Sequence, residues 1–526
     1  MSHRSWIPVT RRATVVVSLM VALSAGAPLL AQQTVPPAQA APQQAAAPQG
    51  PTLELSLAQA VAMALETNLG LKSDRYSLAI SAQGIAAARA AFLPTLTGSV
   101  TRVASTSVTT NQFESAESIT KRSNLNGGAQ WGQALPWYGS SYTVSWGALR
   151  NATNAFTSFN PTLGSSLTVS FRQPLWQRFS IDGNRFSLEN AQRSYQIADL
   201  TMQQQLIATQ DQVRLAYLSL ASAIAGLGVA RENKDVNDVA LRNARARIAV
   251  GNAALIDQIQ SEAAVLTSEE AVIISEANVS TAEDVLRSLL LDPARPDYWQ
   301  VHIVLTDQIE VQERTIDVDA AIKNALANRI DLLSARQQSA QTQLAMRLNQ
   351  NLTKPSLDFA ATYSASGTGG VPLDSQTGLP IGQAIGFGSA LGDAFGHQNP
   401  AWTFGIQAGV PIGQTASRVA VARTQIQLDQ QQLNLRNQEL QIIAQVRDAA
   451  RRVESGYRRV RSTQLALTAS EQQKRAEERK LEVGMASTFD VLLKAQALAS
   501  ARSAELAAKI AYNTALINFE RVQKIR

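Results

Sequence analysis

The chain of 526 residues contains no cysteine. Disulfide bridges, thiol nucleophiles, cysteine metal sites and lipidation of an N-terminal cysteine are therefore excluded. Histidine is nearly as scarce, and His302 and His397 lie in different regions of the chain. A histidine metal site or a histidine-based catalytic pair has no support in this pattern. We therefore expect no enzyme, no metal and no cofactor.

Long apolar runs are missing beyond the N-terminal region. After residue 31, no segment approaches the roughly 18 continuous apolar residues that a spanning helix needs. Aromatic residues make up 6% of the chain, whereas alanine, glutamine and serine are abundant. This composition favours slender helices packed through small side chains over a thick globular core. If the chain crosses a membrane, we expect it to do so as strands.

The N-terminus has the pattern of a secretory signal peptide. Three arginines precede an apolar run that ends at Leu30. We assign residues 1–31 to this peptide, with cleavage between Ala25 and Ala31, and a transmembrane anchor is the alternative. Loss of these arginines lowers the formal net charge from +6 to about +3, which gives no argument for nucleic-acid binding. Residues 32–52, rich in alanine, proline and glutamine, are expected to form a flexible tail.

The rest of the chain carries one pattern twice. A shift of 233 positions aligns Arg185 with Arg418 and Gly251 with Gly484 without a gap. A shift of 261 positions aligns an earlier helix and the proline that ends it in the two copies. The shifts differ by 28, so the first copy holds an insertion of about 28 residues. We place the first repeat at residues 53–291, a linker at 292–313 and the second repeat at 314–526.

Alternating apolar and polar residues follow the first proline of each repeat. This period predicts strands within residues 94–174 and 355–412, about four in all. The inserted residues fall near Ala129 to Leu149, where alternating aromatic residues predict an extra hairpin. The sequence leaves open whether this hairpin joins the sheet or lies outside it. Residues 364–400 are expected to form a glycine-rich loop.

Two long helical runs follow the strands. Their apolar residues return at alternating steps of three and four, which specifies left-handed coiled-coil packing. At 1.5 Å per residue, about 65 residues make a rod of roughly 100 Å. Helices of half that length are expected to pack beside each rod, with Gly251 and Gly484 in the turns at the tips. The helix-to-strand switches are expected at Pro94, Pro174, Pro355 and Pro411.

Four to six strands per chain cannot close a membrane barrel alone, and an open edge in lipid would leave backbone groups unsatisfied. The barrel must therefore be shared between chains. Three chains with four strands each would give twelve, continued by a ring of about twelve helices around a tunnel. We expect an α+β membrane protein, internally duplicated, with a long α-helical coiled-coil barrel and a trimer-shared transmembrane β-barrel.

Several features, in this order and in duplicate, resemble the TolC family of outer-membrane efflux proteins. They are the opening Leu57 to Leu65, the switch Ala91 to Pro94 and the tip Val483 to Gln496. The resemblance covers about residues 53–523. It implies a homotrimer in the outer-membrane lipid of a Gram-negative cell, with a helical tunnel through the periplasm. It also implies a periplasmic adaptor (membrane fusion) protein and an inner-membrane pump of the RND, ABC or MFS type.

The resemblance further implies roles for the tips. Acidic residues narrow the entrance in that family, and Asp490 aligns with one of them, whereas Leu493 stands at the second acidic position. Asp257 matches another tip aspartate, but Ala486 stands where some members have its arginine partner. Three Asp490 carboxylates on one axis would attract cations and raise one another's pKa. The alternative is that Asp490 is the N-cap of the returning helix. The implied adaptor-docking tips are Val250, Gly251, Asn252, Ala253, Val483, Gly484, Met485 and Ala486.

Together these observations predict a passive outer-membrane channel of a tripartite efflux or type I secretion system. The alternative is a periplasmic coiled-coil scaffold or tether without a pore, which would need no lipid-facing strands. The sequence does not name the cargo, the adaptor or the pump.

Two weaker patterns leave alternatives open. Five arginines between Arg451 and Arg461 either line a tunnel or form a solvated helix face paired with neighbouring acids. Aromatic residues such as Trp131 and Trp402 either form membrane-interface belts or pack within the sheet.

Overall fold

The computed structural model describes residues 51–109, 118–251, 254–307, 310–374, 377–410, 412–413 and 415–523. All of them belong to one unit, Gly50–Arg526. The predicted signal peptide, nearly all of the predicted tail and Pro411 lie outside the described residues.

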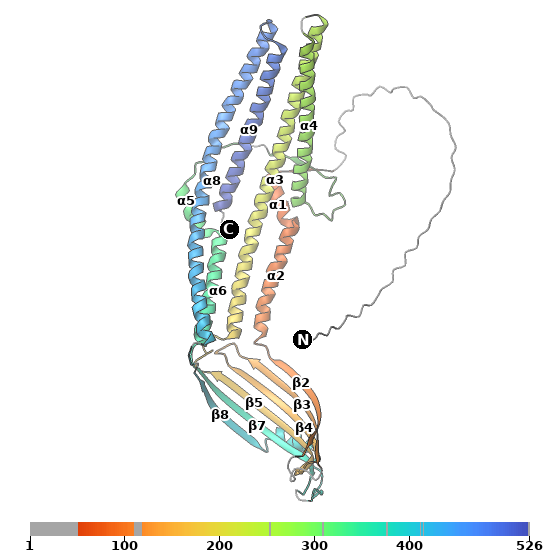
Figure 1. The fold of residues 1–526 in the computed structure, drawn as a ribbon, viewed down its shortest axis with the longest axis vertical. Helices are drawn as coiled ribbons and strands as arrows, with labels where there is room; N and C mark the ends of the chain where they lie inside the picture. Colours follow the sequence, from red (N-terminus) through yellow and green to blue (C-terminus); the bar gives the residue numbers. More distant parts are fainter. Residues whose placement is uncertain are drawn as a thin grey trace, which may run out of the picture. The chain divides into compact units, whose positions relative to one another are not determined.

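Long helices paired with shorter helices form one end of this unit (Figure 1). Each repeat contains one helix of 67 residues. Two shorter helices pack along each long helix, one of 22 or 23 residues near the strands and one of 36 residues near the tip. This confirms the two-ply arrangement expected from the helix lengths. In the first repeat α2 (Leu69–Ala90) and α4 (Leu255–Leu290) pack on α3 (Gly183–Ala249); in the second, α6 (Ile330–Leu352) and α9 (Thr488–Gln523) pack on α8 (Ala416–Glu482).

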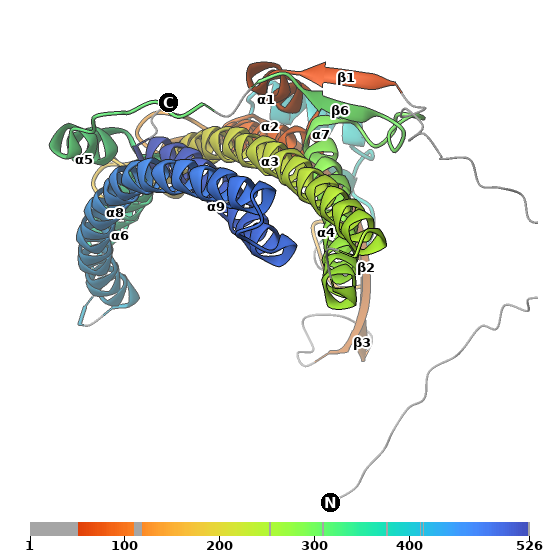
Figure 2. The same ribbon diagram turned by 90° about the horizontal axis from the view of Figure 1, so that it is seen from above.

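Seen from above, these helices form a curved layer (Figure 2). The two repeats meet inside it, because α3 contacts both α6 and α9. Smaller elements lie on the convex side, namely α1 (Leu57–Thr67), α5 (Val318–Asn328), β1 (Thr52–Leu55) and β6 (His302–Leu305). Strand β1 pairs in parallel with β6. Part of the segment expected to link the repeats is therefore a strand.

Two hydrophobic clusters hold the helical layer together. One joins α1, α3 and α4 with β1 and β6, and the other joins α5, α6, α8 and α9. The buried positions recur at the two sequence shifts: Ala64 matches Ala325 and Val213 matches Val446, each at most 1% exposed. Alanine at these contacts lets the helices approach closely. The burial of equivalent residues confirms that the two repeats share one structure.

One eighteen-residue window of α3 has a mean hydropathy of 1.6 and satisfies the length and composition of a spanning helix. This corrects the expectation that no segment comes near that limit. Residues of α3 such as Val213, Tyr217 and Leu220 are buried against α1 and α4. The apolar character of α3 therefore serves packing within the helical layer.

The strands form a six-stranded antiparallel sheet in the order β2-β3-β4-β5-β7-β8. The predicted hairpin is longer than expected and joins the sheet between the first repeat's outer strands, as β3 and β4. The predicted loop from residue 364 is wrong at its start, because β7 extends to Pro372 and a short helix follows. The elements are β2 (Thr95–Val108), β3 (Ile119–Ala134), β4 (Ser141–Thr153), β5 (Phe159–Pro174), β7 (Ser356–Pro372), α7 (Phe387–Phe395) and β8 (Pro400–Gly409).

Candidate functional site

The two faces of the sheet differ in polarity, and the strand register assigns each residue to one of them. Val169 pairs with Tyr363, and Tyr363 pairs with Trp402, so these three side chains share one face. Their neighbours in the chain, such as Thr168 and Thr403, lie on the other. We call these the apolar face and the polar face. The apolar face carries Leu96, Val100, Trp131, Tyr142, Val144, Trp146, Leu167, Val169, Phe171, Tyr363, Trp402, Phe404 and Ile406; the polar face carries Thr97, Ser99, Thr101, Gln130, Ser145, Thr168, Ser170, Thr362, Ser364, Thr403 and Gln407.

Large side chains on the apolar face are exposed. Leu96, Trp402, Phe404 and Ile406 are each 66–70% exposed. Exposed apolar residues on this scale mark a surface that contacts lipid or another protein. Trp131 and Trp402 therefore do not pack in the interior of the sheet, and their place on this face agrees with an interface belt.

The sheet ends in two open edges. Among the described residues, β2 and β8 each pair on one side only. The sheet alternates in direction, so β2 runs away from the helices and β8 runs back toward them. The β2 edge of one chain can therefore pair in antiparallel fashion with the β8 edge of a neighbouring chain. Closure of this kind leaves no backbone group unsatisfied in lipid.

The helix-to-sheet junction is tied by polar contacts. Pro94 and Pro355 directly precede β2 and β7, and Pro174 is the last residue of β5, while Pro411 lies outside the described residues. On the polar face near this junction, the Arg172 guanidinium lies 2.7 Å from the Asp358 carboxylate. Just after β5, the Gln177 side chain donates to the carbonyl of Leu352 in α6 at 2.8 Å, which ties this end of the sheet to the helices.

At the opposite end, each long helix ends in a glycine with positive φ. Gly251 has φ 74° and Gly484 has φ 77°. Met485 donates its backbone N–H to the Lys480 carbonyl at 2.8 Å, and Gly484 donates to the Leu481 carbonyl at 3.2 Å. This bonding is the Schellman motif, which needs a left-handed residue at the position of Gly484.

The tip residues beside these glycines are largely exposed. Val250 is 70% exposed, Val483 69% and Met485 79%, whereas Ala486 is half-buried. Asn252 and Ala253 lie outside the described residues. The described part of the tips thus presents uncharged apolar side chains on tight turns, a surface suited to contact with another protein.

The two tip aspartates have the same position in their helices but different partners. Asp490 is the third residue of α9 and accepts hydrogen bonds from the Ser487 hydroxyl at 2.7 Å and the Ser487 N–H at 2.8 Å. Asp257 is the third residue of α4, where Ala254 at the N-cap has no side-chain oxygen. Among the described residues, the Asp257 carboxylate has no hydrogen bond or ion pair.

This geometry corrects the alternative interpretation of Asp490. The N-cap of α9 is Ser487, whose hydroxyl also accepts the Asp490 N–H at 3.2 Å, so the two residues form a reciprocal cap. Hydrogen bonds from the Ser487 side chain and backbone lower the pKa of Asp490 below its ordinary value. Within one chain, Asp490 is therefore held as a carboxylate at the tip.

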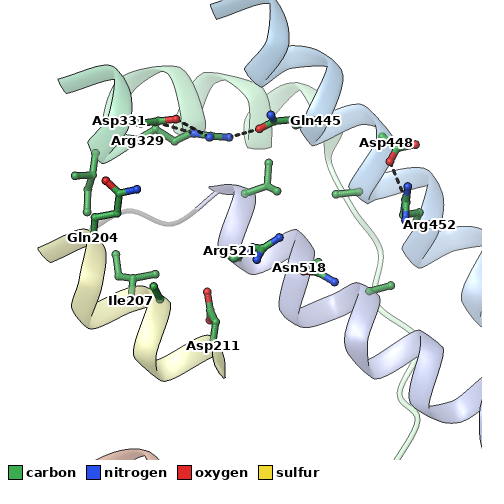
Figure 3. A pocket seen from close by; sticks show the side chains of 15 residues that line it. Gln204, Ile207, Asp211, Arg329, Asp331, Gln445, Asp448, Arg452, Asn518 and Arg521 are labelled. Atoms are coloured by element: carbon green, nitrogen blue, oxygen red, sulfur yellow. Dashed lines mark hydrogen bonds and ion pairs between the residues drawn. The ribbon is translucent and has the colours of Figure 1, made fainter. Parts of the chain in front are cut away.

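A cleft of about 650 Å³ lies where α9 ends and α6 begins, between α3 and α8 (Figure 3). Arg329 lies 2.7 Å from Asp331 and donates to Gln445 at 2.9 Å. Burial alone would raise the pKa of Asp331, but hydrogen bonds and charge from Arg329 lower it overall. The shift of 261 places Asn68 and Gly70 at these two positions in the first repeat. Sequence reasoning missed this pair, although the alignment of the repeats marks it as particular to the second.

Three of the five arginines between Arg451 and Arg461 pair with acids of the same helix, α8. Arg452 lies 2.7 Å and Arg451 3.4 Å from Asp448, and Arg458 pairs with Glu454. The three arginines and the two acids of these pairs are solvent-exposed, so each pair contributes little to stability. This agrees with the interpretation of a solvated, paired helix face. Among the described residues, no group of three or more histidine, aspartate and glutamate side chains is placed to hold a metal.

Solved structures with this fold include outer-membrane channels. The chain superposes on a membrane protein from Pseudomonas aeruginosa with a TM-score of 0.62, at 15% identity, over 89% of this chain and 93% of that one. For the CmeC outer membrane channel of Campylobacter jejuni the TM-score is 0.64, at 14% identity, over 89% and 85%. For the MtrE outer membrane channel of Neisseria gonorrhoeae it is 0.60, at 15% identity, over 89% and 88%.

No curated protein sequence matches the chain. A match to the family described as outer membrane efflux protein covers residues 60–290 and 321–522, one segment in each repeat. The fold, the duplication and the two-faced sheet agree with this match. The chain therefore belongs to the outer membrane efflux protein family, and lies in the outer membrane of a Gram-negative cell with a helical extension in the periplasm.

Proposed function

We propose that the chain is the passive outer-membrane channel of a tripartite efflux or type I secretion system, working as a homotrimer. The observation that carries this proposal is the sheet, which has one exposed apolar face, one polar face and two complementary open edges. A scaffold without a pore would leave the apolar face and both edges in water.

Ring closure through the edges supports a wide barrel. Three chains with six strands each give eighteen strands, an even number within the range of outer-membrane barrels. Barrels of this size enclose an aqueous channel, whereas small barrels are filled by side chains. The polar face would line that channel. The twelve strands expected from the sequence become eighteen because the hairpin joins the sheet.

The widths of the sheet and of the helical layer agree with this closure. At ~4.8 Å between strands and ~40° tilt, six strands span about 38 Å of a barrel's circumference. Four helices side by side at ~9 Å span about 36 Å. Four strands would span only about 25 Å. Six strands therefore let the barrel continue into a ring of twelve helices without a step.

The tips are the proposed contact with a periplasmic adaptor, which would connect the channel to an inner-membrane pump. The exposed Val250, Val483 and Met485 support this role. We further propose that Asp490, and with it Asp257, lines the entrance, because these carboxylates begin the helices that return from the tips. The cargo and the type of pump remain unassigned.

The test is reconstitution of the mature full-length chain in planar bilayers, after determination of its mass by native mass spectrometry. We expect a mass of three chains and discrete ion-conducting steps. A chain purified from outer membranes that remains monomeric in detergent and in lipid, and conducts no ions, would overturn the proposal. Photo-crosslinking from Met485 in cells identifies the adaptor; capture of no periplasmic protein would contradict the docking role.

A further inference from the structure

One segment of the chain covers the outer part of the apolar face. Helix α7 and the residues before it, Thr377 to Gly396, lie between β7 and β8; we call them the α7 segment. The helix packs on β7 and β5, and its Ala390 and Ala394 are fully buried there. A Cβ atom at Gly367 of β7 would lie 2.0 Å from the Ala390 carbonyl oxygen. Only glycine allows this close approach.

Register shows which face the α7 segment covers. Gly367 pairs with Ser165, two residues along each strand from the pair Ala365 and Leu167. Leu167 belongs to the apolar face, so Gly367 does too. On the opposite face at the same level, Ser166 and Ser366 remain exposed. The segment therefore lies on the outside of the proposed barrel, not in its channel.

The sheet has little apolar bulk of its own where this segment lies. The residues of β5 and β7 under the segment are small: Ser165, Ala365, Gly367 and Gly369. A His397 ring nitrogen, just beyond the segment, hydrogen-bonds the Tyr363 hydroxyl at 2.6 Å. The segment thus packs on the part of the apolar face where the sheet has only small residues. The hydrogen bond from His397 connects its end to Tyr363.

The outer surface of the segment is apolar. Leu379 is 65% exposed, Ile381 67% and Phe395 52%. Asp393 is the only charged residue between Thr377 and Gly396, and its Cβ lies on the side of α7 that faces Gly367. Several large exposed apolar side chains on a segment with one charge are typical of a surface that contacts lipid or another protein.

The level of the segment matches the outer boundary of a membrane. From Phe359 to Gly369, ten residues along β7 rise about 25 Å at ~40° tilt, the height of the apolar band of outer-membrane barrels. Arg102 and Arg150 lie on the same face in the row of Gly369, which slopes by about 3 Å per strand at ~40° tilt. Gly369 and the segment over it therefore lie near the outer end of that band.

We propose that the α7 segment lies in the outer leaflet and contacts lipid acyl chains, extending the lipid-facing surface of the sheet. The inference rests on the proposed function, because it takes the apolar face as lipid-facing. A neighbouring chain is a poorer occupant, because α7 packs over β5 and β7 while the chains would meet at β2 and β8. Phe395 and Trp402 are both more than half exposed, which suits contact with lipid.

The absence of cysteine permits a direct test with single nitroxide labels on the reconstituted trimer. Phe395→Cys reports on the α7 segment, Phe404→Cys on the apolar face and Ser166→Cys on the polar face at the level of α7. Collision of each label with oxygen, which concentrates in lipid, is compared with collision with a water-soluble nickel chelate. We expect oxygen to dominate at positions 395 and 404, and nickel to dominate at position 166, with ratios that differ several-fold.

The possible outcomes separate the two proposals. Nickel dominance at 395 with oxygen dominance at 404 would overturn the lipid contact of α7 and leave the channel intact. A label at 395 that neither reagent reaches would place it against protein and also overturn the inference. Nickel dominance at 404 would overturn the lipid-facing sheet itself, and with it the proposed function.

Discussion

The two repeats agree in their helices and differ in their strands. Ala64 and Ala325 are buried at equivalent positions, as are Val213 and Val446. The first repeat nevertheless contributes four strands to the sheet and the second contributes two. A helix in the curved layer must match its neighbours along its whole length. An antiparallel sheet accepts an extra hairpin, because two added strands return the chain to the end where it entered.

The tips of the two repeats also agree in backbone geometry and differ in side-chain contacts. Both turns need a glycine with positive φ, and both returning helices have an aspartate in the third position. Only the second copy has a serine N-cap to bond that aspartate. Backbone geometry is thus shared between the repeats, whereas side-chain contacts at the ends of helices have diverged.

Removal of the β3–β4 hairpin should have the largest effect. Replacing residues 110–157 by a short glycine-serine turn leaves four strands per chain, which span about two thirds of the helical layer's width. We expect the yield of trimer to fall several-fold, measured by native mass spectrometry of extracted membranes. Shortening only residues 110–117 keeps β2 and β3 as the structure describes them and should leave the yield unchanged. Equal yields for both variants would show that the hairpin is dispensable for ring closure.

Substitution of equivalent core residues tests the agreement between the helices. Val213→Ala and Val446→Ala each remove two methyl groups from a site that is 0% exposed. We expect each to lower the free energy of unfolding by roughly 2 kcal/mol, measured from the urea midpoint of the helical circular dichroism signal. Because the sites are equivalent, the two losses should agree within about 1 kcal/mol. A loss at only one site would refute the structural equivalence of the repeats.

The Arg329–Asp331 pair tests a contact found only in the second repeat. Arg329→Gln should destabilise the chain by about 1 kcal/mol at neutral pH, since Asp331 is partly buried and loses its partner. The folded-state pKa of Asp331 is lowered, so its contribution is present above the unfolded-state pKa and is lost as pH falls through the folded value.

The variant and the unmodified chain should therefore converge in stability as the pH falls below the lowered pKa of Asp331, which pH-dependent urea midpoints would detect. Arg336→Gln is the matched control, because the exposed Arg336–Glu439 pair at 3.6 Å should contribute little. A constant difference between Arg329→Gln and the unmodified chain at every pH would show that Asp331 is not responsible.

The smallest effect is expected at the tips. Asp490→Ala should reduce the preference of the reconstituted channel for cations, measured from reversal potentials in a salt gradient. Within one chain, hydrogen bonds from Ser487 lower the pKa of Asp490, whereas three facing carboxylates would raise it. A loss of cation preference only below the ordinary aspartate pKa would show that the hydrogen bonds dominate in the trimer. Asp257→Ala is the matched variant in the first repeat. Unchanged selectivity in both variants would remove these aspartates from the entrance.

Much of the architecture was predictable because it depends on local periodicity. Shifts of 233 and 261 positions, steps of three and four residues, and alternation after Pro94 and Pro355 predicted the repeats, the helices and the strands. These signals are strong because a helix face or a strand face must stay apolar along its length. Gly251 and Gly484 were predictable for a similar reason, since a left-handed turn favours glycine.

Contacts between segments distant in sequence were not predictable. The pairing of β1 with β6 and the cleft at Arg329 join residues that no local pattern relates. The N-cap role of Ser487 was missed because the boundary of α9 decides it, and helix boundaries shift by a residue or two without a change in periodicity.

By itself, the sequence determined the duplication, the long paired helices, the two-faced strands and the turns at the tips, since each depends on which side chains recur at a fixed spacing. Only the tertiary structure decided that the hairpin enters the sheet and that α7 lies on its apolar face. Both depend on register: the pairing of Trp131 with Leu96 and of Val144 with Val169 places the hairpin in the sheet, and the bare backbone of Gly367 admits the helix. Register is a relation between strands, and no single strand carries it.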